Sequence, residues 1–344
     1  MAAPPMEHRC GPRDGGVSGR PAVAGPGKRV CAAWPRCSRL SARAIAAALT
    51  FAAATALAVE VNFQPVAPGI YAHIGETGGR TYDNEGLNAN LGLVVTPAGS
   101  VLIDSGATYR SARQIQEAIR RVTDRPVKWV INTGGQDHRW LGNGWFKEQG
   151  AEIIAHANAR ADMQARGSDH LQALRPVLKE RLDGTVPVLP TRWIEGNDVR
   201  LELGGVAFEL KHRSGAHTPG DMMVWLPARG VLFTGDVVYV ERLLGVIPVS
   251  NTRRWLETFA VIEQLNPKVI VPGHGKVTDL ATARADTKAY LEALRAHMKK
   301  AVDDGTDISA AIPGFDAQPY MRLLNAAELH PGNASRTYLE LERE

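Results

Sequence analysis

Cysteine is scarce in this chain of 344 residues, and its three copies, Cys10, Cys31 and Cys37, all lie near the N-terminus. Residues 59–344 therefore contain no thiol. This excludes a disulfide framework, a thiolate metal site and a cysteine nucleophile in that part of the chain. The absence of cysteine also suits an oxidising compartment, and we expect a periplasmic or secreted protein.

Long apolar runs are scarce as well. The run over residues 44–58 follows a basic stretch and ends in Ala56-Leu-Ala58, the small-residue pattern that precedes a signal-peptidase cut. Its about fifteen residues are too few to span a bilayer. We expect residues 1–58 to be an export signal cut after Ala58. An uncleaved anchor, and a true translation start nearer Val30, are the alternatives.

Residues 59–344 have no excess of positive charge, although the net charge of the whole chain is +4. Residues 1–58 hold eight of the 40 basic and two of the 36 acidic side chains, which leaves 32 basic and 34 acidic side chains for residues 59–344. The electrostatic attraction that dominates nucleic-acid binding is therefore absent. We expect a small-molecule substrate, no nucleic-acid partner, and no membrane contact after signal cleavage. A hydrophobic content of 44% is that of a soluble globular protein.

Short apolar strands alternate with amphipathic helices from residue 59 onward. Their lengths and their bounding Gly, Pro and Thr residues are typical of strands buried in a mixed α/β domain. We expect strands near residues 70–74, 89–95, 100–104, 127–131, 152–155, 199–203, 206–211, 222–226, 230–234 and 268–271. Helices are expected near residues 111–122, capped by Ser111, and near 157–182, 253–265 and 281–302. The sequence thus predicts one domain over residues 59–302 and a helical tail over residues 303–344.

Three segments place a histidine or an aspartate just after an apolar strand. They are residues 129–138, residues 215–221 with 233–236 close behind, and residues 271–275. Loops at strand ends can aim such side chains into a shared cleft. Imidazole nitrogens and carboxylate oxygens are the ligands that zinc and iron prefer. The sequence therefore predicts a metal-dependent enzyme with the candidate ligands Asp137, His138, His217, Asp236 and His274.

The same segments resemble the metal motifs of the metallo-beta-lactamase superfamily, over residues 66–302. Family members carry Asn-Thr-His-x-His-x-Asp-His, Gly-x-His-Thr-x-Gly, Thr-Gly-Asp and Pro-Gly-His-Gly, and the last three motifs are intact around His217, Asp236 and His274. The resemblance implies a four-layer αββα sandwich, the metallo-beta-lactamase fold. It also implies that a hydroxide generated at a zinc ion cleaves an ester, thioester or amide of a small molecule.

A narrower resemblance comes from Leu141-Gly-Asn143 and from residues 333–342. Both are similar to segments of the exported quinoprotein-relay-system zinc metallohydrolases. This resemblance implies a partnership with an exported quinoprotein oxidation system.

The first motif departs from the family pattern, because residues 132–138 are one residue short of it. If a gap precedes Asp137, then Asp137 and His138 keep the family roles. Without a gap, His138 stands at the place of the family's aspartate, Gln136 at that of the second histidine and Arg139 at that of the last. The gapped alignment is simpler, and we adopt it here. It leaves one metal site nearly complete and the other with only His217 and the shared carboxylate, so one ion is expected, zinc, with iron as the alternative.

The resemblance also implies roles for individual residues. Asp137 or Asp236 would act in catalysis by orienting the hydroxide or moving its proton, and Asp104 would brace the metal loops from the second shell. His156, after the strand at 152–155, is a possible extra ligand.

Two alternatives to a hydrolase stay open. One is an iron-dependent sulfur or persulfide dioxygenase. The other is a catalytically decayed accessory or binding protein of an exported oxidation system. Beta-lactamase activity is less expected, since the altered first motif lacks ligands. The sequence does not identify the substrate, because the loops that line such a cleft determine specificity.

Overall fold

The computed structural model describes residues 60–344, and the predicted export signal lies outside this range. One sheet has seven strands in the order in which they follow along the chain. Strands β1 to β4 pair antiparallel, whereas β4 to β7 run parallel. Its strands are β1 (Gln64–Ala67), β2 (Ile70–His73), β3 (Leu91–Thr96), β4 (Gly99–Ile103), β5 (Val127–Ile131), β6 (Glu152–His156) and β7 (Arg192–Ile194).

A second sheet has five strands in the order β12-β11-β10-β9-β8. Its pairs are antiparallel except that of β11 with β12, which is parallel. The strands are β8 (Asp198–Leu203), β9 (Val206–His212), β10 (Met222–Leu226), β11 (Val231–Phe233) and β12 (Val269–Val271).

The two sheets pack face to face. Ile103 and Ile131 of the first sheet share one buried apolar cluster with Phe208, Val224 and Phe233 of the second. Strands β4 and β10 are buried along their whole length, and the sequence of β10 is accordingly a continuous apolar run rather than an alternating one.

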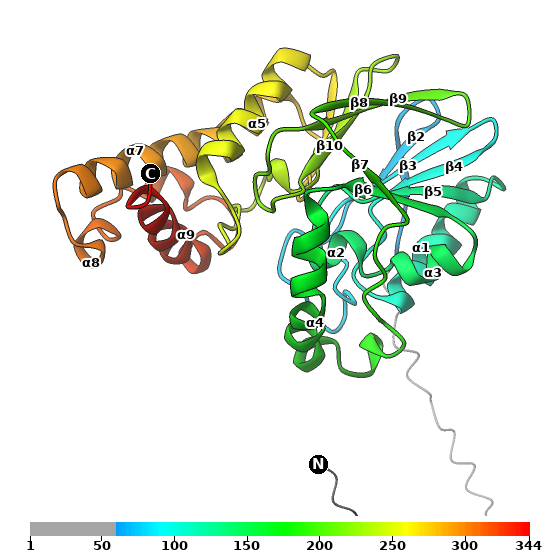
Figure 1. Cartoon of the computed structure of the whole chain (residues 1–344), viewed down its shortest axis with the longest axis horizontal. Coiled ribbons are helices and arrows are strands. Elements are labelled where there is room, and N and C mark those ends of the chain that lie inside the picture. The colour runs from blue at the N-terminus through cyan, green and yellow to red at the C-terminus, as the bar shows by residue number, and fades with distance from the viewer. Residues whose placement is uncertain (1–59) are drawn as a thin grey trace, which may run out of the picture. The chain divides into compact units, whose positions relative to one another are not determined.

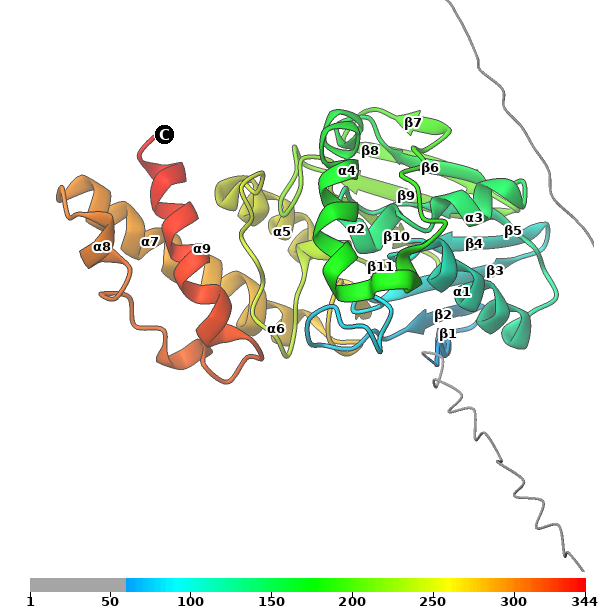
Figure 2. The same ribbon diagram turned by 90° about the horizontal axis from the view of Figure 1, so that it is seen from below.

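Helices cover the outer faces of both sheets (Figures 1 and 2). Helices α1 (Tyr109–Val122) and α3 (Asn143–Glu148) pack on the first sheet, where Ile115 and Phe146 meet Val130 and Ile153. Helix α5 (Thr252–Leu265) packs on the second sheet. The predicted four-layer αββα sandwich is confirmed.

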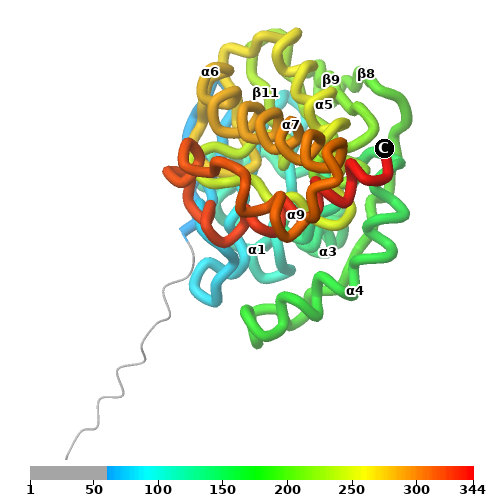
Figure 3. Tube along the Cα trace, turned by 90° about the vertical axis from the view of Figure 1, so that its left-hand side faces the viewer, coloured from blue at the N-terminus to red at the C-terminus, as the bar shows by residue number. Residues whose placement is uncertain are grey.

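The C-terminal helices continue the apolar cluster of the second sheet. Helices α7 (Ala289–Asp303) and α9 (Ala326–Leu341) lie side by side, as Figure 3 shows. Their buried side chains, including Leu294 and Tyr338, join those of α5. No helix among residues 60–344 has the length and apolar character that a membrane crossing requires. The remaining helical segments are α2 (Asp137–Trp140), α4 (Ala159–Leu178), η1 (Lys179–Leu182), η2 (Gly235–Val237), α6 (Leu280–Ala283), η3 (Arg284–Lys288), α8 (Ile308–Ala311) and η4 (Gln318–Tyr320).

Some predicted boundaries are wrong for local reasons. Helix α1 is capped by Thr108 rather than Ser111, which is the third helical residue and closes a reciprocal capping box with Thr108. The helix expected over residues 281–302 is interrupted by the π-helical turn η3. Strands β1 and β7 were not predicted, because they are short edge strands with little apolar pattern.

Candidate metal centre

The predicted site residues gather where neighbouring strands end. In the parallel pair β11 and β12, Phe233 lies opposite Val271, so the loops that carry Asp236 and His274 leave the sheet together. In the parallel pair β4 and β5, Ile103 lies opposite Ile131, which places Asp104 beside the start of the loop to α2. Carboxyl ends of parallel strands meet at one edge, so segments far apart in sequence converge there.

Three of the five predicted ligands form one buried group. His138, Asp236 and His274 each offer a ligand atom, and these atoms lie within 4.8 Å of one another. His138 Nε2 is 3.1 Å from Asp236 Oδ2, and His274 Nε2 is 3.2 Å from Asp236 Oδ1. The arrangement is that of two imidazoles around one carboxylate.

The hydrogen bonds of His274 indicate whether this group fits a metal ion. Its Nδ1 donates a hydrogen bond to the carbonyl oxygen of Asn88 (2.7 Å). Burial lowers the pKa of His274 well below its ordinary value, which favours the neutral ring, and the hydrogen bond from Nδ1 leaves Nε2 as an acceptor. This Nε2 lies 3.2 Å from Asp236 Oδ1, which is also an acceptor, so the two atoms repel each other. A cation between the two atoms would turn this repulsion into coordination, so these residues fit a divalent metal ion.

A buried arginine holds the carboxylate in place. Arg139 Nε donates to Asp236 Oδ2 (3.2 Å), its Nη2 pairs with Asp236 Oδ1, and its Nη1 donates to Asp104 Oδ2 (2.9 Å). Burial by itself would raise the pKa of Asp236, but Arg139 and His138 hold it well below its usual range. Asp236 is therefore ionised and held in one orientation, as a metal ligand would be.

Asp104, which the resemblance places in the second shell, is bonded to Arg139 and does not reach the group of three. It accepts hydrogen bonds from the backbone nitrogen and the hydroxyl of Thr133, both at 2.7 Å. Its φ of 64° lies in the left-handed region, which costs energy for a residue with a Cβ. The carboxylate at this end of β4 is bonded to Arg139 of α2 as well as to Thr133.

Asp137 and His217 lie next to the group but outside it. Asp137 pairs with Arg80 and accepts a hydrogen bond from the backbone nitrogen of His138 (2.8 Å). Although burial opposes it, Arg80 holds the pKa of Asp137 far below its usual range. His217 Nδ1 donates to the carbonyl oxygen of Gly245 (2.8 Å), and burial lowers the pKa of His217 to about 4.

His156 lies elsewhere. Its ring stacks on that of His212 with centroids 3.6 Å apart, and its Nε2 is 3.2 Å from the carbonyl oxygen of Gly196. The structure does not bring His156 to the group of three.

A cavity of about 140 Å³ opens beside the group. His217, absent from the group itself, lines this cavity together with His138 and His274. The phenol of Tyr239 stacks on the ring of His274 with centroids 4.8 Å apart, and burial raises the pKa of Tyr239 well above its ordinary value. The other lining residues are Arg80, Asn88, Gln136, Arg242, Gly245, Ile247 and Leu329.

The two arginines of this lining were missed by the sequence analysis. Arg80 belongs to the loop between β2 and β3, and Arg242 to the loop that follows η2. Neither sits in a motif, and only the fold brings them to the cavity.

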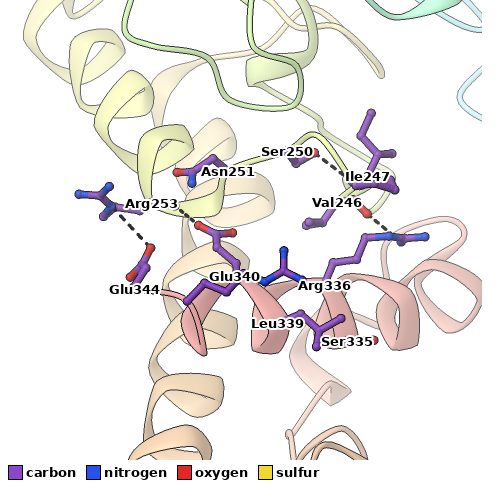
Figure 4. A pocket seen from close by; sticks show the side chains of 12 residues that line it. Val246, Ile247, Ser250, Asn251, Arg253, Ser335, Arg336, Leu339, Glu340 and Glu344 are labelled. Atoms are coloured by element: carbon purple, nitrogen blue, oxygen red, sulfur yellow. Dashed lines mark hydrogen bonds and ion pairs between the residues drawn. The ribbon is translucent and has the colours of Figure 1, made fainter. Parts of the chain in front are cut away.

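A larger hollow, of about 670 Å³, lies between residues 246–253 and α9 (Figure 4). Arg336 donates to the carbonyl oxygen of Val246 across it (2.8 Å), and Arg253 pairs with Glu344 at 3.5 Å. Ile247 lines both this hollow and the cavity beside the metal ligands. One loop therefore separates the two spaces.

The sequence and the fold both have known counterparts. Residues 84–274 match the profile of the Metallo-beta-lactamase superfamily. The human acyl-coenzyme A thioesterase MBLAC2 (Homo sapiens) is 27% identical over 219 residues, which cover 57% of this chain and 75% of that protein. The alpha subunit of 2,4-dinitroanisole O-demethylase from Nocardioides sp. (strain JS1661) is 26% identical over 178 residues, 51% of this chain. The match spans only 49% of that subunit's length.

Among solved structures, a metallo-beta-lactamase from Pontibacter korlensis superposes with a TM-score of 0.55 at 23% identity, covering 67% of this chain and 99% of the other. Likeness at this identity concerns the fold. The profile match covers 191 of the 344 residues and ends at the candidate ligand His274. By its profile match, its fold and its His-Asp-His group, this chain belongs to the metallo-beta-lactamase superfamily.

Proposed function

We propose that this protein is an exported, zinc-dependent hydrolase that cleaves an ester, thioester or amide of a small molecule. The observation that carries the proposal is the group of His138, Asp236 and His274, whose two histidines line a cavity. A divalent ion held by these residues would polarise the bond under attack and lower the pKa of a bound water towards about 7. The thioesterase activity named for MBLAC2 supports an ester or thioester as the target.

The chain's own side chains supply the rest of the site. His217 donates through Nδ1 to Gly245, so its unprotonated Nε2 is free to accept a hydrogen bond from a water or a substrate hydroxyl. The hydroxyl of Tyr239 stays protonated because the pKa of Tyr239 is raised, and it is a neutral donor for an oxygen that gains negative charge. Asp236 stays ionised, and Arg139 keeps it in one orientation.

We further propose that the first motif aligns without a gap. Both alignments make His138 a candidate ligand, and His138 faces Asp236 and His274. In the ungapped alignment His138 occupies the place of the family's aspartate. Asp137, which the gapped alignment makes a ligand, pairs with Arg80 instead. The ungapped alignment puts Gly134 where the family has its first histidine.

The space next to the two glycines is already filled. A Cβ on Gly134 would come within 2.5 Å of Asp221 Oδ1, and a Cβ on Gly135 within 2.4 Å of Asp162 Oδ2. Asp221 is bound to Thr218, and Asp162 to Arg166. These contacts support a site for one metal ion rather than two.

Export and partnership are proposals that rest on the sequence alone. The basic and apolar N-terminal segment supports transfer to the periplasm or the outside of the cell. The similarity of residues 333–342 to the quinoprotein-relay hydrolases supports a role beside an exported quinoprotein oxidation system.

A second candidate function is favoured by the ligand set. Two histidines and one carboxylate with open positions are also the ligands of iron enzymes that use oxygen. On this hypothesis the protein would oxidise a persulfide or a related sulfur compound.

The deciding experiment is the metal content per chain of protein purified from its own cells, measured by elemental mass spectrometry. We expect about one zinc ion per chain, lost in His274→Ala and Asp236→Asn and retained in His297→Ala. His297 is a matched control because it bonds the carbonyl oxygen of Ala311, outside the site. Hydrolysis of a panel of esters and thioesters should disappear in the same two variants.

The other outcomes are equally informative. Iron with oxygen consumption on a persulfide would replace the hydrolase by the dioxygenase. A folded wild-type protein that takes up neither metal would contradict both and leave an accessory protein without catalysis.

A further inference from the structure

The cavity is lined by two arginines that have no role in the proposed hydrolysis. Arg80 and Arg242 both line the cavity, and no carboxylate side chain does. The Nε atom of each arginine is buried and has no hydrogen-bond partner in the part of the chain that the structure describes. Groups of this kind are expensive to bury unless a partner satisfies them.

Arg242 differs from the other buried arginines of residues 60–344. Arg139 pairs with two carboxylates, and Arg181 lies 3.5 Å from Glu85. Arg242 is only 9% exposed, yet no carboxylate of the described residues lies within the 4.0 Å of an ion pair. Within residues 60–344 the side chain of Arg242 makes one hydrogen bond, donated by Nη1 to the carbonyl oxygen of Gly78 (2.9 Å). A buried guanidinium without a carboxylate partner is costly, and the binding of an anion to it would offset that cost.

The backbone holds Arg242 in position before any ligand arrives. Leu324 donates to the carbonyl oxygen of Glu241, and Leu243 donates to that of Leu324, both at 2.9 Å. Asp286, in the π-helical turn η3, accepts from the backbone nitrogen of Glu241 (3.0 Å). With the backbone held on both sides, the burial of Arg242 and the hydrogen bond of its Nη1 to Gly78 leave the side chain little freedom to lose on binding, which favours affinity for a matching group.

Arg80, in the loop between β2 and β3, is the second arginine that lines the cavity. Its Nη2 pairs with Asp137 and lies 2.8 Å from His138 Nδ1, so its head group is anchored next to a candidate metal ligand. The charge of Arg80 is thus partly balanced by Asp137, whereas that of Arg242 is not.

We propose that this cavity recognises an anionic group of the substrate, with Arg242 as the principal contact and Arg80 as the second. The inference rests on the proposed function and narrows its substrate to an ester, thioester or amide that carries a carboxylate or a sulfate- or phosphate-like oxyanion. The planar guanidinium offers parallel N–H donors that match such groups. A cavity of about 140 Å³ is smaller than the roughly 300–1,000 Å³ that holds a whole drug-sized ligand. It therefore takes the charged end and the reacting bond, and the rest of the substrate lies outside it.

The test measures anion binding without catalysis. The full chain, stripped of metal, is titrated with radiolabelled acetate and with radiolabelled sulfate in equilibrium dialysis at low ionic strength. We expect one saturable site per chain, weakened about ten- to a hundredfold in Arg242→Met, a loss typical of a charged hydrogen bond. Arg80→Gln should weaken binding less. Preference for acetate or for sulfate separates a carboxylate from the larger oxyanions.

Two further variants serve as controls for this binding test. Arg192→Met removes an arginine at a strand edge whose partner is Glu152 at 3.5 Å, and it should bind as the wild type does. If Arg242→Met does not fold, Arg242→Lys keeps a charge but loses the planar fork, and it should show intermediate affinity.

Two results would overturn the proposal: no saturable site in a folded wild-type chain, or equal affinity in wild type and Arg242→Met. Because the measurement uses metal-free protein, its failure is separate from that of the proposed hydrolysis. A chain that binds these anions through Arg242 but hydrolyses no ester would support the anion site and contradict the enzyme.

Discussion

At the scale of single residues, Arg139 organises the site without touching the cavity. It is buried between Asp104 and Asp236 and is bonded to both. Replacing it by methionine would keep most of the volume but leave two buried carboxylates without their counter-charge. We expect Arg139→Met to lower the free energy of unfolding by about 3–5 kcal/mol, measured by urea denaturation.

Arg139→Lys is the control for this prediction. It restores one positive charge but not the fork that reaches two carboxylates, so its stability should lie between those of the wild type and Arg139→Met. Equal stability of all three proteins would show that Arg139 is not needed to balance these charges.

Asp221 is a second residue whose charge state has a measurable effect. Burial raises the pKa of Asp221 to about 7, against about 3.9 in an unfolded chain. Between these values the folded state holds a proton that the unfolded state has released, so this group lowers stability as the pH rises through that window. The effect is absent below about pH 4 and complete above about pH 7.

Asp221→Asn mimics the protonated acid and should remove this pH dependence. Its amide can still accept from the backbone nitrogen of Thr218, the 2.8 Å bond of the wild type. The variant should therefore gain a few kcal/mol relative to the wild type on going from pH 4 to pH 8. Urea unfolding at several pH values measures this, and parallel curves for the two proteins would contradict it.

Residue types and spacing could identify the three residues of the His-Asp-His group but not their neighbours. His138, Asp236 and His274 were predicted because each follows an apolar strand within a motif. Whether Asp137 or His138 faces Asp236 and His274 depends on which side chain the first turn of α2 turns inward, and two adjacent residues cannot be told apart by spacing. The contact of Asp137 with Arg80 joins residues 57 positions apart, and nothing local indicates it.

At the scale of elements, the loop between β5 and α2 carries the two glycines that support the proposal of a single metal ion. Its two glycines let Asp221 and Asp162 approach the backbone. We expect Gly134→His, which restores a histidine at the place given by the ungapped alignment, to bind no additional metal. It should also lower the melting temperature, since its Cβ would lie 2.5 Å from Asp221 Oδ1.

Metal content by elemental mass spectrometry and a thermal melt test this prediction together. Gly79→His is the matched control, because a Cβ at Gly79 meets nothing within 4 Å. Two ions per chain in Gly134→His would show that the second metal site is absent only because its histidine ligand is missing.

The strands and long helices could be predicted because burial gives them regular apolar patterns. The π-helical turn η3 could not. It places Thr287 so that its hydroxyl accepts from the backbone nitrogen of Tyr239 (3.0 Å) and donates to the carbonyl oxygen of Tyr239 (2.6 Å). This turn is thus determined by a distant part of the chain rather than by its own residues.

At the scale of the whole molecule, α9 fixes the loop that borders the site. Asn333 accepts from the backbone nitrogen of Val246 (2.7 Å) and donates to the carbonyl oxygen of Leu244 (2.8 Å). Between these two residues lies Gly245, which accepts the hydrogen bond of His217. Asn333→Ala should lower the free energy of unfolding by roughly 3 kcal/mol, since buried backbone groups lose their partners.

Ser335→Ala is the control for Asn333→Ala, two positions along the same helix. Ser335 lines the outer hollow and not the inner cavity. Chemical denaturation compares the two variants. A loss in Ser335→Ala as large as that in Asn333→Ala would mean that the helix, rather than this amide, stabilises the fold.

Leu329 of α9 lines the cavity, and Leu324 is hydrogen-bonded to the loop of Arg242. The cavity is therefore walled in part by residues that follow every strand of both sheets along the chain. Because synthesis runs from the N-terminus, both sheets and the candidate ligands His138, Asp236 and His274 are made before this part of the wall. A chain cut before Leu324 would keep these three candidate ligands but would leave one side of the cavity open.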